Sequence, residues 1–318
     1  GNTEAMANAV GEGIKAAGFD VVRMPVAYSH QFEDASTYKI KSAWMDKVET
    51  AVKAALDAGL YVIINIHWEG GWLNHPVDAN KEALDERLEA MWKQIALKFR
   101  DYDDRLLFAG TNEVNNDDAD GAQPTEENYR VQNGFNQVFV NTVRATGGRN
   151  HYRHLIVQAY NTDVAKAVAH FTMPLDIVQN RIFLECHYYD PYDFTIMPND
   201  EDFKSQWGAA FAGGDVSSTG QEADIEATLG SLNVFINDNV PVIIGEYGPT
   251  LRDQLTGEAL ENHLKSRNDY IEYVVKTCVK NKLVPLYWDA GYTEKLFDRT
   301  TGQPHNAASI AAIMEGLN

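Results

Sequence analysis

Residues 241–247 read Pro-Val-Ile-Ile-Gly-Glu-Tyr, a short apolar run that ends on a carboxylate and an aromatic ring. A run that is apolar at consecutive positions is typical of a strand buried on both faces, as in a parallel sheet covered by helices. Other segments share this character. Together they predict strands over residues 20–26, 61–68, 106–114, 155–160, 182–189, 241–247 and 284–288.

Amphipathic stretches alternate with these strands. They predict helices over residues 4–17, 43–57, 81–99, 126–145, 222–237 and 258–280. Gly18, Gly59 and Gly147 stand where helices are expected to stop. The alternation continues without a break in composition, so we expect a single α/β domain over residues 1–318, either a closed barrel or an open doubly wound sheet.

The barrel is favoured by where the polar residues stand. No glycine-rich phosphate loop follows any predicted strand, and polar side chains stand at the C-terminal ends of at least five of them. An open sheet would gather its chemistry at one switch point, whereas a (β/α)8 TIM barrel distributes it over many strand ends. The predicted strands are one short of eight, so the first barrel strand is expected upstream of Gly1. Otherwise the barrel would have an open seam, or another element would fill it.

Composition excludes several classes of partner. The chain has 318 residues, 44% of them apolar, and no run of eighteen apolar residues, so no membrane span is expected. Its 46 acidic and 27 basic residues give a net charge of −19, which would repel nucleic acid and anionic lipid. The two cysteines, Cys186 and Cys278, cannot form a disulfide framework. A neutral substrate is compatible with such a surface.

The predicted strand ends carry residues whose side chains are suited to catalysis or binding. These are Arg23, His67, Asn112, Glu113, His187, Tyr189, Glu246 and Trp288. Each of them alone is more often structural: a solvated glutamate, a rim ion pair, a hydrogen-bonded histidine or a core tryptophan. Charged groups that converge in a low-dielectric barrel mouth need partners, and their joint occurrence therefore indicates a site.

The two glutamates suggest the chemistry. Glu113 follows an asparagine and Glu246 lies beside an aromatic residue, so different surroundings can give them different pKa values. Cleavage of a glycosidic bond uses such a pair, one carboxyl as proton donor and the other as an ionised nucleophile. Arg23 is expected to keep the nucleophile ionised, and Tyr189 is expected to donate a hydrogen bond to it.

The motifs at these positions resemble those of glycoside hydrolase family five, the retaining cellulase-type enzymes, over essentially the whole chain. The matching segments are Val22-Arg23-Met24-Pro25, residues 65–72, Asn112-Glu113, residues 187–191, Gly245-Glu246-Tyr247-Gly248 and Tyr287-Trp288-Asp289. No single motif is decisive, but their joint order is specific. The usual first strand is missing, and the segment after Glu113 lacks the proline that many relatives carry, which leaves the role of that loop open.

The resemblance implies roles for individual residues. Glu113 would be the acid/base, Glu246 the nucleophile, and Asn112 a contact to the sugar 2-hydroxyl. His187 and Tyr189 would orient the carboxylates. Arg23 would lie under the nucleophile, while His67 and Trp288 would line the subsite of the reacting sugar. The family is retaining, which predicts carboxyl groups about 5 Å apart, and its members need no metal or organic cofactor.

The expected function is that of an endo-β-1,4-glucanase acting on cellulose, xyloglucan or mixed-linkage glucan. A β-mannanase is the nearest alternative, because the two backbones differ at one hydroxyl. A catalytically silent carbohydrate-binding barrel and a metal-dependent barrel hydrolase are further alternatives; the latter is disfavoured because His67 and His187 lack partners at ligand spacing. A polymeric substrate implies a secreted, cell-surface or periplasmic protein, which we expect to be a monomer.

Other features have less specific meaning. Trp68 and Trp72 are expected to stack on sugar rings, and Tyr188, Tyr192 and Trp207 are further candidates. The long segment 191–220 is expected to form one wall of an open cleft. Residues 116–127 approximate a calcium-loop spacing, but an asparagine at the first ligand position favours an acidic turn that caps the next helix.

Overall fold

The computed structural model describes residues 2–117 and 123–318, and its central feature is a seven-stranded parallel sheet. The strands pair in the order β1-β4-β5-β6-β7-β8-β9. Neighbours in this sheet therefore follow one another along the chain, apart from β2 and β3, which form a separate two-stranded sheet. Their bounds are β1 (Val21–Met24), β4 (Tyr61–Asn65), β5 (Leu106–Ala109), β6 (Leu155–Gln158), β7 (Ile182–Tyr188), β8 (Val242–Tyr247) and β9 (Val284–Tyr287). Each of the seven predicted segments contains one of these strands.

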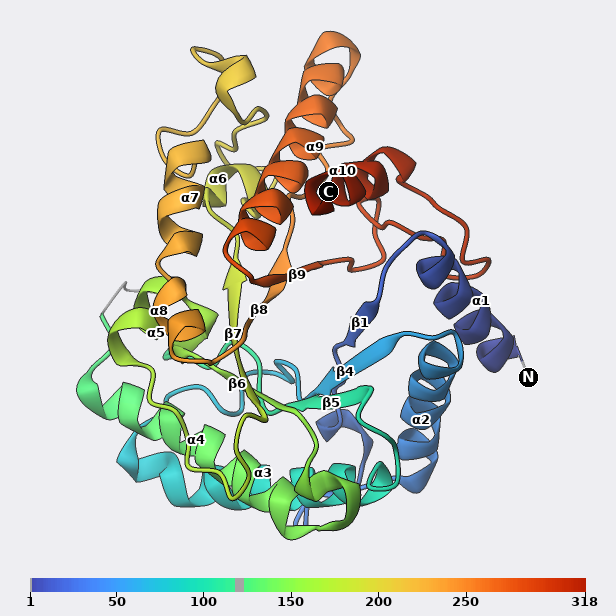
Figure 1. Cartoon of the computed structure of the whole chain (residues 1–318), viewed down its shortest axis with the longest axis vertical. Helices are drawn as coiled ribbons and strands as arrows, with labels where there is room; N and C mark the ends of the chain where they lie inside the picture. Colours follow the sequence, from blue (N-terminus) through green and yellow to red (C-terminus); the bar gives the residue numbers. More distant parts are fainter. Residues whose placement is uncertain (1, 118–122) are drawn as a thin grey trace.

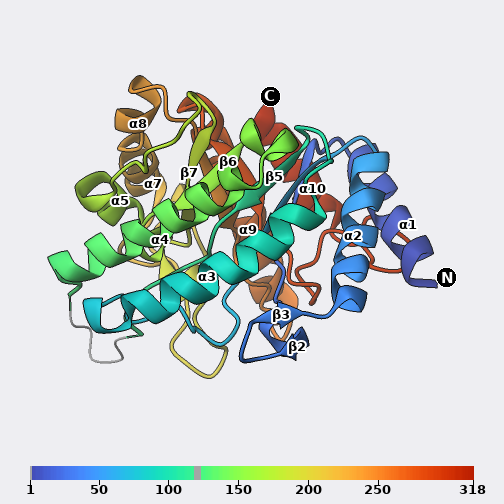
Figure 2. The ribbon, with the colours of Figure 1, turned by 90° about the horizontal axis from the view of Figure 1, so that it is seen from below.

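Helices cover the outside of the strands (Figure 1), as a parallel sheet buried on both faces requires. They are α1 (Asn2–Ala16), α2 (Ser42–Asp57), α3 (Asp78–Lys98), α4 (Glu126–Ala145), α5 (Val164–His170), α6 (Tyr192–Thr195), α7 (Glu222–Gly230), α8 (Asn233–Asn237), α9 (Gly257–Lys280) and α10 (Ala307–Leu317). The 3-10 helices η1 (Ser29–Gln31), η2 (Gly148–His151), η3 (Tyr160–Thr162) and η4 (Ala209–Phe211) lie between them. A short hairpin of β2 (Phe32–Asp34) and β3 (Lys39–Ile40) lies at one edge of the molecule (Figure 2).

The predicted helix over residues 222–237 is wrong in one respect, because it is divided into α7 and α8. α7 ends at Gly230, where Asn233 Nδ2 donates to the Gly230 carbonyl at 2.8 Å. The Ser231 hydroxyl likewise donates to the Thr228 carbonyl at 2.6 Å. Side chains thus satisfy carbonyls that a continuous helix would have paired, and the chain bends there.

Several strands end earlier than predicted. β5 ends at Ala109, five residues before the end of the predicted segment 106–114. Gly110 N still donates to the Ile156 carbonyl at 3.0 Å, but Thr111 N donates to Gln158 Oε1 at 3.0 Å. A side chain therefore replaces the neighbouring strand as acceptor, and the residues that follow leave the sheet at the mouth of the barrel.

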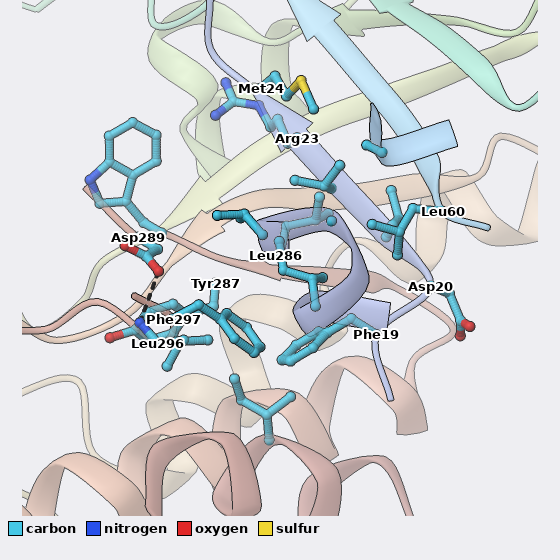
Figure 3. Close-up of a pocket in the computed structure, with 18 of the residues that line it drawn as sticks. Phe19, Asp20, Arg23, Met24, Leu60, Leu286, Tyr287, Asp289, Leu296 and Phe297 are labelled. Atoms are coloured by element: carbon cyan, nitrogen blue, oxygen red, sulfur yellow. Dashed lines mark hydrogen bonds between the residues drawn. The ribbon is translucent and has the colours of Figure 1, made fainter. Parts of the chain in front are cut away.

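The sheet curls into a nearly closed parallel barrel, which confirms the predicted fold class. β1 and β9 are the two edge strands, and within the described part of the chain they are not hydrogen-bonded to each other as sheet neighbours. A cavity of about 600 Å³ adjoins β1, β9 and α1, and Figure 3 shows Phe19, Leu60 and Leu286 gathered around it. The origin of an eighth strand stays a prediction. Within residues 2–117 and 123–318, no helix is long and apolar enough to span a bilayer.

Tight packing outside the barrel supports the end of β5. Trp92 of α3 packs against Phe108 of β5 and Phe139 of α4, with ring centroids 5.3 and 4.6 Å apart. The Trp92 indole also donates to the Gly110 carbonyl at 2.8 Å. A Cβ added at Gly110 would lie only 2.7 Å from the Phe139 ring. Glycine is therefore needed where the chain leaves the sheet.

Gly110→Ala is expected to lower the free energy of unfolding by about 1–3 kcal/mol, because the Phe139 ring or the backbone must move. Gly134→Ala is the matched control, since a Cβ there meets only the end of the Lys81 side chain, at 3.4 Å. Gly134 lies inside α4, where replacement by alanine should raise the free energy of unfolding by about 0.5–1 kcal/mol. Urea unfolding midpoints measure both changes, and equal effects in the two variants would contradict the packing argument.

Candidate active site

The strand ends surround a cavity of about 440 Å³ at the mouth of the barrel. Its lining includes predicted site residues that lie at or just beyond the ends of β4, β5, β7, β8 and β9, namely His67, Trp68, Asn112, Glu113, Tyr189, Glu246 and Trp288. Arg23 and His187 lie beneath this lining, with side chains only 3% and 2% exposed. The barrel topology thus brings together residues that are distant in the sequence.

Glu246 is held in a ring of donors at the end of β8. Arg23 Nη1 donates to Glu246 Oε2 at 3.0 Å, and the Tyr189 hydroxyl donates to Oε1 at 2.8 Å. Arg23 Nη2 also donates to Asn112 Oδ1 at 2.9 Å. Both oxygens of Glu246 act as acceptors, as those of an ionised carboxylate do.

The charges around Glu246 also affect its donors. Burial would lower the pKa of Arg23, but Glu185 and Glu246 outweigh it and raise that pKa. Burial, together with the negative charge of Glu246, raises the pKa of Tyr189 far above its ordinary value. Both residues therefore remain protonated donors, and Glu246 keeps both hydrogen bonds throughout the neutral pH range.

Glu113 has a different environment, since it contacts a histidine. Its Oε2 lies 2.6 Å from His187 Nδ1 and 3.4 Å from the Thr162 hydroxyl, and its side chain is 37% exposed. Burial would lower the pKa of His187, but the carboxylates of Glu246, Glu113 and Glu185 raise it to about 9. Burial would raise the pKa of Glu113, but the hydrogen bond from His187 and its charge lower it.

A register shift in the sheet places His187 beside Glu246. β7 and β8 change register between Cys186 and His187, after which His187 lies opposite Glu246. Glu113 reaches the same place from the chain beyond β5, and one ligand atom from each of Glu113, His187 and Glu246 lies within 4.8 Å of the others. Two carboxyl groups this close match the spacing of about 5 Å that retaining glycosidases use, not the 6.5–9.5 Å of inverting ones.

The same three residues are the group whose spacing could hold a metal ion within the described ranges. The arrangement is unfavourable for a cation, because Arg23 already places its positive charge 3.0 Å from Glu246 Oε2. His187 Nδ1 is also taken up by its 2.6 Å contact with Glu113. These residues fit a hydrogen-bonded proton site better than a metal site.

His67 and Trp288 form one side of the cavity. Their rings are stacked with centroids 5.6 Å apart and an interplanar angle of 8°. Burial and then the positive charge of Arg23 lower the pKa of His67 to about 4, so this imidazole is neutral at neutral pH. Asn65 Nδ2 lies 3.3 Å from His67 Nδ1 and leaves Nε2 as the protonated nitrogen.

The remaining aromatic candidates are in different places. Trp68 lines the cavity and is 61% exposed, whereas Trp72 is absent from the lining. The Trp72 indole donates to Glu69 Oε2 at 2.9 Å, and the guanidinium of Arg87 lies 4.2 Å from the centre of its ring. Tyr192 is 51% exposed.

Tyr188, the last residue of β7, and Trp207 are buried in the same core cluster, where they cannot stack on a ligand in this structure. The segment 191–220 does contribute to the mouth of the barrel, through Thr195 and Ile196. The cleft wall predicted from this segment is thus present, but it is formed by the start of the segment.

The acidic turn before α4 is only partly described. Asp118, Asp120 and Gly121 of the calcium-like spacing lie outside the described residues. The predicted cap on α4 by an acidic residue is wrong, since Thr125 accepts from Asn128 N and closes a capping box with the Asn128 side chain. A threonine hydroxyl can cap a helix in place of a carboxylate, although it ranks below aspartate at this position.

Glu185 is the residue that the motif comparison missed. It lies in β7, has no exposed surface, and contacts Arg23 Nε at 3.2 Å and His187 Nε2 at 2.8 Å. Its signal in the sequence was a carboxylate inside an apolar strand, two residues before His187 and hence on the same face. A buried carboxylate requires partners, and the alternation of the strand shows where they must be.

Comparison with known proteins adds independent evidence. The family model described as Cellulase (glycosyl hydrolase family 5) matches residues 1–294. The chain is 96% identical over 307 residues to the xyloglucan-specific endo-β-1,4-glucanase BoGH5A of Bacteroides ovatus, covering 96% of this chain and 61% of that protein. It is 33% identical over 326 residues to endoglucanase A of Paenibacillus barcinonensis, covering 96% of this chain and 79% of that protein.

Solved structures agree with this relationship. A Bacteroides ovatus GH5 xyloglucanase in complex with a XXXG heptasaccharide superposes with a TM-score of 0.97 at 95% identity, covering 98% of this chain and 67% of that one. A family 5 xyloglucanase from Paenibacillus pabuli in complex with ligand gives a TM-score of 0.90 at 35% identity, covering 98% and 90%. The predicted resemblance is confirmed, and the chain belongs to glycosyl hydrolase family 5.

Proposed function

We propose that the chain is a retaining endo-β-1,4-glucanase with xyloglucan as its substrate. The observation that carries this proposal is the pair of carboxyl groups within 4.8 Å, one held by Arg23 and Tyr189 and the other by His187. Two glutamates at this spacing, in opposite environments, suit double displacement at a sugar.

In the first step Glu246 attacks the anomeric carbon. The bond to the leaving oxygen breaks, and Glu113 transfers its proton to that oxygen, which leaves as a free hydroxyl. The product is a glycosyl ester on Glu246, with Glu113 as a carboxylate. In the second step Glu113 takes a proton from water, the water oxygen attacks the anomeric carbon, and Glu246 is released with net retention.

The neighbours of each carboxyl fit these roles. Arg23 and Tyr189 are positioned to stabilise Glu246 both as the attacking carboxylate and as the departing one. His187 can share the proton of Glu113 across their 2.6 Å contact and so orient its carboxyl group. Asn112, 5% exposed at the cavity floor, is suited to hold a sugar hydroxyl, and the stacked rings of His67 and Trp288 are suited to hold the reacting sugar.

The open rim of the cavity supports cleavage at internal bonds of a polysaccharide. Trp68 and Tyr292 line the opening and are 61% and 74% exposed, so they offer flat surfaces beside an open mouth. The chain spans 61% of the length of the xyloglucan-specific relative that it matches at 96% identity. This identity supports xyloglucan over mannan as the preferred backbone. Trp72 could act on the substrate only through Glu69 or after a side-chain movement.

We further propose that the enzyme acts outside the cytoplasm, at the cell surface, in the periplasm or after secretion, because its polymeric substrate is located there. A monomer with one catalytic domain over residues 1–318 is the simplest organisation that fits the site, since every proposed catalytic group comes from one chain. A neutral polysaccharide is also compatible with the net charge of −19.

The substrate can be tested with the wild type and Glu246→Gln on xyloglucan, carboxymethyl cellulose, mixed-linkage β-glucan and mannan. We expect a rapid viscosity loss and reducing-sugar release on xyloglucan, reduced about 10³-fold or more in the variant because the covalent step is lost. Activity on mannan alone would replace the substrate. Binding without hydrolysis by the wild type on every polymer would indicate a binding protein instead.

The two carboxyl roles can be tested by azide rescue with an activated aryl glycoside. Glu246→Ala should yield the α-glycosyl azide, because azide enters where the nucleophile was removed. Glu113→Ala should yield the β-glycosyl azide, because azide replaces water in the second step. Glu294→Ala, which removes another carboxylate of the cavity lining, is the control and should yield neither product. The reverse pattern would mean that the roles are exchanged.

A further inference from the structure

Glu185 lies below the two proposed catalytic carboxyl groups and touches neither. Its Oε1 accepts from Gln158 Nε2 at 2.8 Å, while its Oε2 lies 2.8 Å from His187 Nε2. Arg23 Nε is 3.2 Å from the same Oε2, an ion-pair contact without hydrogen-bond geometry. The carboxylate has no exposed surface, so these neighbours replace all of its solvent.

Gln158 presents a fixed hydrogen-bond donor to Glu185. The backbone N–H of Thr111 donates to Gln158 Oε1 at 3.0 Å, and the Thr111 hydroxyl lies 2.8 Å from the same atom. The Gln158 oxygen must therefore face Thr111, and its amide nitrogen must face Glu185 as a donor. Burial would raise the pKa of Glu185, but Arg23 and His187 outweigh it and lower that pKa to about 2. Glu185 is an acceptor at both oxygens.

The position of Glu185 is also shaped by its neighbour in the sheet. A Cβ added at Gly245 would lie 1.9 Å from Glu185 Oε2. Gly245 immediately precedes Glu246, so the same motif that carries the proposed nucleophile leaves space for the buried carboxylate. The Gly-Glu pair of β8 therefore accommodates two carboxylates around one guanidinium.

Because Glu185 can only accept, His187 must carry its proton on Nε2 in both of its protonation states. Nδ1 then faces Glu113 Oε2 at 2.6 Å, a distance at which two lone pairs would repel. A single proton must lie between them, on the carboxyl of Glu113 or on Nδ1 of His187. The chain Glu113–His187–Glu185 thus stores the proton that the first catalytic step consumes.

We propose that Glu185 is a positioning residue for acid catalysis. It fixes the Nε2–H tautomer of His187 and strengthens the hold of the Glu113–His187 pair on their shared proton, and so sets the alkaline limit of activity. This inference rests on the proposed function, since it assigns Glu185 to the acid step of that reaction.

The charges facing His187 determine whether loss of the Glu185 charge raises or lowers the pKa of the Glu113–His187 pair. Glu113, Glu185 and Glu246 are negative and favour its protonated form, whereas Arg23 is positive and disfavours it. His67, with its pKa lowered to about 4, is neutral in the pH range of the test. Removing the charge of Glu185 must therefore lower the pKa at which the pair loses its proton, and the alkaline limb of kcat/KM reports that loss in the free enzyme.

Glu185→Gln tests the proposal through the pH profile of kcat/KM on xyloglucan oligosaccharides. The alkaline limb should move down by about 1–3 pH units, the usual effect of one charge at this range. Cleavage of a 2,4-dinitrophenyl glycoside, whose leaving group needs no proton, should lose much less than cleavage of the natural bond. Glu185→Asp retains the charge and should restore the limb. An unchanged limb, or equal losses on both substrates, would overturn the proposal.

Asp176→Asn is the matched control. Asp176 forms a buried bidentate pair with Arg144, at 2.9 Å for each contact, so the variant also removes a buried carboxylate charge. It should lower stability and leave the alkaline limb in place, because no proposed catalytic group contacts it. A similar shift in this variant would assign the effect to general destabilisation and would overturn the proposal.

A second measurement is independent of activity. ¹⁵N NMR of the imidazoles, with the His187 signals assigned through His187→Asn, reports which nitrogen carries the proton. We expect Nε2–H in the wild type from pH 5 to 10, and a change toward Nδ1–H in Glu185→Gln, where an amide can donate to Nε2. A wild type with Nδ1–H alone would overturn the proposal. If the wild type hydrolysed no polymer, the proposed function would fail while this measurement still tested the tautomer.

Discussion

The structure depends on the burial of two carboxylates beside one guanidinium. Arg23 reaches from β1 to Glu246 of β8 at 3.0 Å and to Glu185 of β7 at 3.2 Å. Each carboxylate alone would be costly to bury, and two of them without a cation would repel each other. The guanidinium satisfies both and also holds Asn112 beyond β5, so one side chain joins elements across the interior of the barrel. His187 and Gln158 supply the remaining donors.

This charge arrangement explains how a barrel can hold one carboxyl group ready to attack and another ready to donate. The register shift between β7 and β8 brings His187 opposite Glu246, while the chain beyond β5 brings Glu113 to the other imidazole nitrogen. Glu246 accepts hydrogen bonds from Arg23 and Tyr189, which keep their protons. Glu113 instead shares one transferable proton with His187. The difference lies in the neighbours of the two glutamates rather than in their strands, as the proposed division of roles requires.

Much of this organisation could be predicted because parallel barrels translate sequence order into position. Each apolar run marked a strand, and each strand end delivered its polar residue to one mouth, which is why Glu113 and Glu246 could be paired across more than a hundred residues. The direction in which individual side chains point could not be predicted as well. Trp72 and Trp207 follow strands or loops near the mouth, yet one packs with Arg87 and the other lies in the core. The break between α7 and α8 depends on side-chain caps that periodicity does not register. Glu185 lies inside a strand rather than at its end, so only its alternation with His187 along β7 marks it.

The central claim is that Glu246 forms a covalent bond to the sugar while Glu113 handles the proton. Incubation with a 2-deoxy-2-fluoro-β-glycoside bearing a dinitrophenyl leaving group, followed by peptide mapping by mass spectrometry, tests it directly, since the fluorine slows the second step and preserves the intermediate. The account predicts one glycosyl group per chain, attached to the peptide that contains Glu246. Attachment at Glu113, or turnover that gives the inverted anomer with no labelled peptide, would contradict it.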